Sequence, residues 1–177
     1  MNSSSTSLLE QAYSAEVLRE IPTRGRRFYF ADSATTTPLL VRFTLADGTS
    51  WHGGFGAGTL ATRALTGVFA TSSATRACVA SSGRAYFVEV EHPEMTEVII
   101  PELVTQVWLD AESGVLLIAD PWRIRAYSEV GESWSGDRIA VEGLSILSTD
   151  GCVAVVRLDE DGEGREVKVS LRTGALV

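Results

Sequence analysis

The fold is decided by residues 104–139, which read VTQVWLDAESGVLLIADPWRIRAYSEVGESWSGDRI. Short apolar runs alternate here with Gly, Pro, Asp, Glu and Ser. Runs of this length between such residues are typical of strands and turns rather than of helices. The stretch therefore predicts one antiparallel meander of four strands. The predicted strands are 104–109, 115–119, 123–127 and a fourth that begins near Ser133-Trp134.

The same pattern recurs before and after this stretch. Residue 65 aligns with 104, 77 with 116 and 84 with 123, at a constant offset of 39 residues. A third copy begins at residue 144 and turns at Asp150-Gly151. A period of about 40 residues with about four strands per unit is typical of propeller blades. The blade-like repeats are predicted at 65–101, 104–140 and 143–177.

The central strand of each repeat is apolar on both faces, as expected of sheets stacked face to face. We therefore predict burial of Leu117, Ile118, Val155 and Val156. The fold class that follows is all-β, with successive antiparallel four-stranded meanders resembling a β-propeller, whose closure into a ring the sequence leaves open. A β-sandwich is the alternative.

The chain is predicted to form a single β domain over residues 1–177, with two further elements before the repeats. Ser7 precedes a loose apolar stripe and Glu10 follows three residues later, which predicts a short helix over 7–20. Residues 26–60 form a hairpin region. Within it, 39–45 and 49–55 pair across Asp47-Gly48, because Asp-Gly suits the positive φ angles of tight turns.

Residues 126–134, AYSEVGESW, resemble the strand–turn–strand end of a blade in the quinoprotein type of β-propeller. In that type an Ala and an Asp precede a Thr-Gly turn and a Trp follows. Residues 169–176, VSLRTGAL, resemble the same segment without the Trp. The resemblance covers residues 65–177 and implies a propeller-like fold.

Composition limits the classes of partner. The net charge is −8, and the excess of acidic residues lies in residues 86–177. Because nucleic-acid phosphates would be repelled, we expect no nucleic-acid partner. We also expect no membrane association, since no apolar run approaches the ~20 residues of a membrane span. The first residues lack the pattern of a secretory signal, so we expect a cytoplasmic protein.

Several stretches resemble chemical sites. Cys78 and Cys152 have no CxxC partners, and we predict two unpaired, buried thiols. The glycine-rich run 53–59 lacks the lysine of a phosphate-binding loop and is interpreted as a flexible connection. The acidic groups at 89–97 and 159–164 are interpreted as solvated strand ends and hairpin tips. We therefore predict no metal site, no cofactor and no catalytic residue.

The candidate binding residues are Trp122, Arg123, Trp51 and His52. Trp122 and Arg123 occupy a predicted hairpin tip, and Trp and Arg are enriched at binding hot spots. The alternative for Trp122 is packing against the next repeat. The function expected is a non-catalytic binding or interaction module that binds a protein or a small ligand, and an immunity-type protein would be one module of this kind. The alternatives are a hydrolase acting on a sugar or phosphate ester, and a structural subunit of a homo-oligomer.

Overall fold

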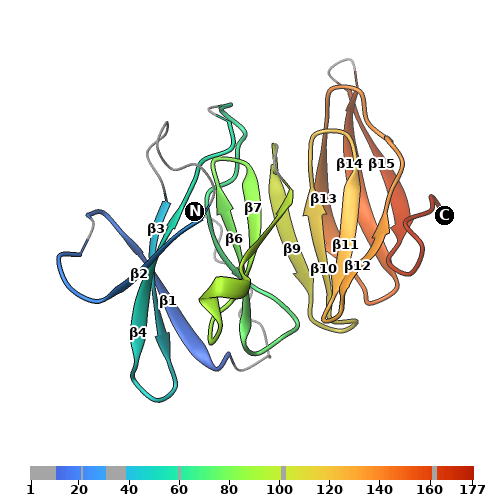
Figure 1. Cartoon of the computed structure of the whole chain (residues 1–177). Coiled ribbons are helices and arrows are strands. Elements are labelled where there is room, and N and C mark those ends of the chain that lie inside the picture. Colours follow the sequence, from blue (N-terminus) through green and yellow to red (C-terminus); the bar gives the residue numbers. More distant parts are fainter. Residues whose placement is uncertain (1–10, 21, 31–38, 60, 101–102, 161–162) are drawn as a thin grey trace.

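The structure, a computed structural model, describes residues 11–20, 22–30, 39–59, 61–100, 103–160 and 163–177. Its strands form four small sheets that stand side by side as successive layers (Figure 1). We name them sheets A to D in the order in which they are stacked. The protein is all-β and its sheets are like propeller blades, as predicted. A stack of four sheets, rather than two packed sheets, decides against the β-sandwich.

Sheet C is the meander predicted from residues 104–139. It has the order β12-β11-β10-β9, so each strand pairs with its neighbour in the chain. All of its pairs are antiparallel. Its strands are β9 (Gln106–Asp110), β10 (Val115–Ala119), β11 (Ile124–Ser128) and β12 (Gly131–Ser135).

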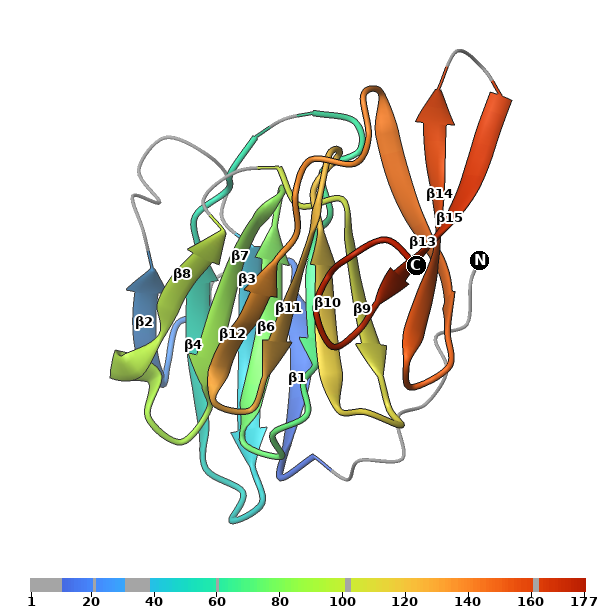
Figure 2. The ribbon, with the colours of Figure 1, turned by 90° about the vertical axis from the view of Figure 1, so that its right-hand side faces the viewer.

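Sheets B and D repeat this plan on either side of sheet C. Sheet B consists of β5 (Gly67–Ala70), β6 (Arg76–Ser81), β7 (Arg84–Glu89) and β8 (Glu97–Ile100), with a 3₁₀ turn at Pro93–Met95 before β8. Sheet D consists of β13 (Gly143–Thr149), β14 (Val153–Glu160) and β15 (Glu163–Ser170). A single bridge between Val169 and Leu176 stands where a fourth strand would lie. Figure 2 shows β1 and β9 along one side of the stack, and β8 and β12 along the other.

Sheet A is the divergent layer. Its order is β1-β3-β4-β2, formed by β1 (Tyr13–Leu18), β2 (Arg26–Phe30), β3 (Leu39–Leu45) and β4 (Ser50–Phe55). The β3–β4 hairpin across Asp47-Gly48 is confirmed, with φ of +82° at Gly48. The β2–β4 pair is parallel. Because β1 and β2 occupy opposite edges, the connection between them, described at residues 19–20 and 22–25, crosses from one edge of the sheet to the other.

The predicted N-terminal helix is wrong over its described part. Residues 13–18 are β1, which pairs antiparallel with β3 from Tyr13↔Leu45 to Leu18↔Leu40. Tyr13, Ala15 and Val17 alternate with more polar residues, and this period-two pattern suits a strand as well as the loose stripe suits a helix. Pairing with β3 satisfies the backbone groups on one side of the segment from Tyr13 to Leu18, and such tertiary pairing overrides helix propensity. Residues 7–10 lie outside the described residues.

Three apolar cores lie between the four sheets. The first joins sheets A and B and contains Phe43 and Tyr86. The second joins sheets B and C and contains Phe87 and Ile118. The third joins sheets C and D and contains Leu117 and Val156, among others. Burying both faces of β6 and β10 in this way explains why their sequences are continuously apolar.

The outer face of sheet D, at one end of the stack, is less buried than the faces between the sheets. Leu117, Ile118 and Val156 are buried as predicted, but Val155 is only half-buried. Val155 alternates with Val156 and so faces away from sheet C, on the outer face of sheet D. An Arg157–Glu166 ion pair lies on this face. The outer face of sheet D is therefore partly exposed and carries charged residues beyond Val155, as expected of a sheet with one wet face.

Side chains tie sheets C and D together. The side-chain amide of Gln106 donates to the carbonyl oxygen of Ile146 at 2.9 Å, and its oxygen accepts from the Ile146 N–H at 2.7 Å. The Trp108 indole N–H donates to Thr149 Oγ1. Asp110 accepts from Ser113. Burial alone would raise the pKa of Asp110, but hydrogen bonds from Ser113, Thr149 and Gly151 outweigh it and lower that pKa.

The structure bears on the prediction of two unpaired, buried thiols. Cys78 and Cys152 are both free, as predicted. Cys78 is buried, and burial raises its pKa to about 12. The predicted burial of Cys152 is wrong, because Cys152 lies in the exposed β13–β14 turn. No helix in the described part of the chain has the length and apolarity to cross a membrane.

The run 53–59 is not the flexible connection expected, since residues 53–57 are buried. A Cβ at Gly53 would lie 2.6 Å from the Phe55 ring, and one at Gly54 would lie 2.7 Å from the Tyr29 ring. A side chain at either position would therefore collide with an aromatic ring unless that ring moved. Beyond the strand, the Gly58 N–H donates to the Ser81 carbonyl oxygen.

Candidate functional site

The four predicted binding residues lie in two separate places. Trp51 and His52 are on β4 in sheet A. Trp122 and Arg123 are in the turn between β10 and β11 of sheet C. Sheet B lies between the two pairs (Figure 1). The four residues therefore do not form one site.

Trp51 belongs to the core. Its side chain is 3% exposed and stacks on Phe43, with 4.6 Å between the ring centroids. Its indole N–H donates to the Val90 carbonyl oxygen at 2.8 Å, which ties sheet A to sheet B. The ring of Trp51 therefore holds two sheets together and is not accessible to a ligand. Of the two predicted binding residues on β4, this leaves His52.

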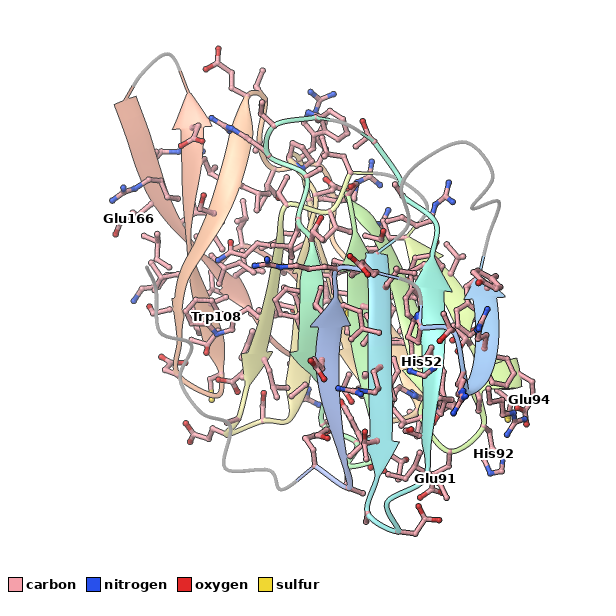
Figure 3. The ribbon with its side chains drawn as sticks, turned by 90° about the vertical axis from the view of Figure 1, so that its left-hand side faces the viewer. His52, Glu91, His92, Glu94, Trp108 and Glu166 are labelled. Atoms are coloured by element: carbon pink, nitrogen blue, oxygen red, sulfur yellow. The ribbon has the colours of Figure 1, made fainter. Side chains whose placement is uncertain are left out.

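His52 follows Trp51 on β4 and points to the opposite, outer face of sheet A. Figure 3 looks onto this face, with His52 on it. The segment around Gly25 folds against the imidazole ring, and a Cβ at Gly25 would lie 2.9 Å from its Cε1 atom. His52 Nδ1 is buried and has no hydrogen-bond partner among the described residues. His52 thus sits beside the crossover rather than in a catalytic pair.

An open groove of about 460 Å³ lies beside His52. Its wall is formed by the crossover on one side and by strands of sheet A on the other. The residues that line it are Leu18, Pro22, Thr23, Arg24, Gly25, Arg42, Ser50 and His52.

The Trp122 turn is held by an aspartate. Asp120 Oδ1 accepts from the backbone N–H of Trp122 at 2.8 Å and of Arg123 at 2.9 Å. This arrangement lets an aspartate close a turn with its own side chain. The Trp122 carbonyl oxygen accepts from the N–H groups of Ile139 and Ala140, so the loop after β12 packs on the turn.

Trp122 differs from the other three tryptophans. Trp51, Trp108 and Trp134 all pack in the cores between sheets, and each donates its indole N–H to a hydrogen bond. Trp122 belongs to none of these cores and is 36% exposed. Its indole N–H has no partner within the described ranges. Trp122 is therefore the most exposed of the four tryptophans and lies outside the three cores.

One arginine lies over the Trp122 ring, and two others lie beside Asp120. Arg138 lies over the ring, with its Cζ atom 5.6 Å from the ring centroid. Arg123 Nε lies 3.7 Å from Asp120 Oδ2, and Arg125 lies 3.8 Å from the same oxygen. We call Trp122, Arg123 and Arg138 the Trp122 tip. Sequence reasoning missed Arg138, because its position depends on the path of the loop after β12.

The acidic group at residues 89–97 is dispersed. Glu89 pairs with Arg76, while Glu91 and Glu94 are exposed. Glu91, His92 and Glu94 project at one corner of the molecule in Figure 3. Within the described residues, no three His, Cys, Asp or Glu side chains are grouped so as to hold a metal ion. Residues 161–162, at the tip of the predicted 159–164 hairpin, lie outside the described residues.

Comparison with known proteins gives one structural similarity. No protein-family model and no curated protein matches this chain. Among solved structures, a chain described as "Crystal structure of the eukaryotic initiation factor" aligns with it at 13% sequence identity and a TM-score of 0.46. The alignment covers 77% of this chain and 41% of that chain. This chain thus spans less than half the length of that structure.

Proposed function

We propose that this protein is a non-catalytic binding module and that a partner protein packs on the Trp122 tip. The observation that carries the proposal is the contrast between Trp122 and the other tryptophans. Three indoles are committed to the cores, whereas the fourth keeps one-third of its surface and its N–H donor open. A large ring of this kind supplies much of the binding energy at protein interfaces.

The surroundings of the ring support a protein partner. The Asp120 side chain and the loop after β12 fix the turn, so little conformational freedom remains to be lost on binding. Arg138 places a guanidinium group over the ring, and Arg123 follows Trp122 in the turn, near Asp120. Guanidinium groups suit carboxylate or carbonyl acceptors on a partner. We infer that the partner presents acidic residues next to an apolar side chain.

Binding is favoured over the hydrolase alternative by the state of His52. A histidine that acts as a general base is usually oriented by an acceptor on its other ring nitrogen. His52 Nδ1 has no such acceptor among the described residues. The homo-oligomer alternative finds less support, because the outer face of sheet D carries an ion pair rather than a continuous apolar surface.

Two further proposals accompany this function. We propose that residues 65–177 are related to quinoprotein-type propellers. What supports this is that Trp134, from one of the two matching segments, contacts Gly174 of the other. We also propose a cytoplasmic location and no nucleic-acid or membrane partner. Free thiols at Cys78 and Cys152 and the net charge of −8 are in keeping with both.

The proposal is tested by comparing what the wild-type chain and three variants retain from cell extract. Trp122→Ala removes the ring, Arg138→Gln removes the cation over it, and Arg172→Gln is a control at an exposed turn of sheet D. We expect quantitative mass spectrometry to find a protein retained by wild type and by Arg172→Gln. Its retention by Trp122→Ala should be weaker by about thirtyfold, the effect of losing about 2 kcal/mol at a hot spot. Identical retention by all four proteins would contradict the proposal.

A further inference from the structure

The crossover between β1 and β2 creates a second feature on sheet A, separate from the Trp122 tip. The described part of this crossover, residues 19–20 and 22–25, passes between the edges of the sheet, and the groove beside His52 stays open to solvent. The groove volume of about 460 Å³ is within the range of small-ligand sites. Arg24 and Thr23 line it from the crossover, and Ser50 and His52 line it from β4.

This end of the molecule is basic, although the protein is acidic. The described residues from 11 to 59 include five arginines and three acidic residues, Glu16, Glu20 and Asp47, in a chain of net charge −8. Residues 86–177 carry the opposite excess. The net charge therefore favours the approach of an anion to sheet A over its approach to residues 86–177 as a whole.

The cations near the groove are not equally available. Arg42 pairs with Glu16 on the neighbouring strand, so its charge is already neutralised. Arg24 is exposed and pairs with no carboxylate of the described part of the chain. His52 lines the groove as well, but its Nδ1 atom is buried. Arg24 is thus the cation that lines the groove and remains open to a ligand.

We propose that this groove binds a phosphate-class oxyanion, carried by a small molecule. Arg24 supplies the fixed positive charge and several N–H donors in a fork that matches phosphate oxygens. Thr23 and Ser50 supply hydroxyl donors from opposite walls, and the His52 imidazole supplies a further nitrogen. Donors arranged on several sides suit a tetrahedral oxyanion better than a planar carboxylate. Leu18 and Pro22 form an apolar part of the groove wall, which suits the rest of the ligand.

The test uses inorganic phosphate as the probe and follows backbone amide signals by NMR, with ionic strength held constant by sodium chloride. We expect saturable shifts at Thr23, Arg24, Gly25 and His52, half-complete at about 1–10 mM for a few charge-assisted bonds in an open site. Amides of the Trp122 tip should not shift. Acetate, titrated in the same way, should bind more weakly than phosphate.

Two variants and one control decide the outcome. Arg24→Gln and His52→Ala should each weaken phosphate binding, Arg24→Gln by about tenfold or more because it loses a charged donor. Arg172→Gln, an arginine far from the groove on sheet D, should bind as wild type does. The proposal is overturned if no saturable shift appears, if acetate binds as well as phosphate, or if Arg24→Gln binds as tightly as Arg172→Gln. None of these results bears on the Trp122 tip, so the two proposals fail separately.

Discussion

Replacing Leu117 with aspartate is expected to abolish soluble expression of this protein. Leu117 is fully buried on β10 and packs in the core between sheets C and D. An aspartate there must either leave a carboxylate unpaired in the core or remain protonated, and both cost several kcal/mol. A domain is stable by only about 5–15 kcal/mol, so one such change is expected to unfold it.

The control is the same substitution at Val130, which is 97% exposed in the turn between β11 and β12. Val130→Asp should express and melt as wild type does, because no core contact is lost. The two variants are compared by soluble yield and by circular dichroism. A folded Leu117→Asp protein with the wild-type melting temperature would show that sheets C and D are not stacked as described.

Trp134→Ala is expected to destabilise the protein by about 3–5 kcal/mol. Trp134, on β12, packs against the core between sheets C and D, and its indole N–H donates to the Leu171 carbonyl oxygen at 2.7 Å. The ring lies against Gly174, which has φ of +73°, and a Cβ there would be 2.5 Å from Trp134 Cε3. One side chain thus fastens the last strand of sheet C to the final turn of sheet D.

The expected fall in melting temperature is roughly 6–20 °C for a chain of this size. Trp134→Phe should fall in between, because it keeps most of the packing but loses the hydrogen bond. Thermal unfolding followed by circular dichroism measures both variants. A Trp134→Ala protein that melts within about 2 °C of wild type would remove Trp134 from the account of how the sheets are joined.

The sequence predicted sheets B to D well because their signal is local. In residues 115–119 the apolar run is continuous and is bounded by turn residues, so the strand and its burial on both faces follow together. Val155 shows the limit of that inference. Its run looks like that of β10, yet no sheet covers the outer face of sheet D in the described structure, and a sequence run does not say which unit is the last.

Sheet A and the sites were harder to predict because they depend on contacts between distant segments. The parallel pairing of β2 with β4 and the crossover of residues 19–25 leave no periodic pattern in the sequence. The place of Arg24 beside Ser50 and His52 follows only from that crossover. The same is true of Arg138, which reaches Trp122 from another loop.

The claim that Trp122 is kept for a partner rather than for folding is tested most directly by the melting temperature of Trp122→Ala, measured beside Trp134→Ala. Trp122 lies outside the three cores, and its clearest contact is with the Arg138 guanidinium. Losing a cation–π contact costs about 1 kcal/mol, so we expect a fall of about 2–4 °C. This is well below the fall expected for Trp134→Ala. A fall for Trp122→Ala as large as that for Trp134→Ala would make Trp122 a structural residue and contradict the proposed function.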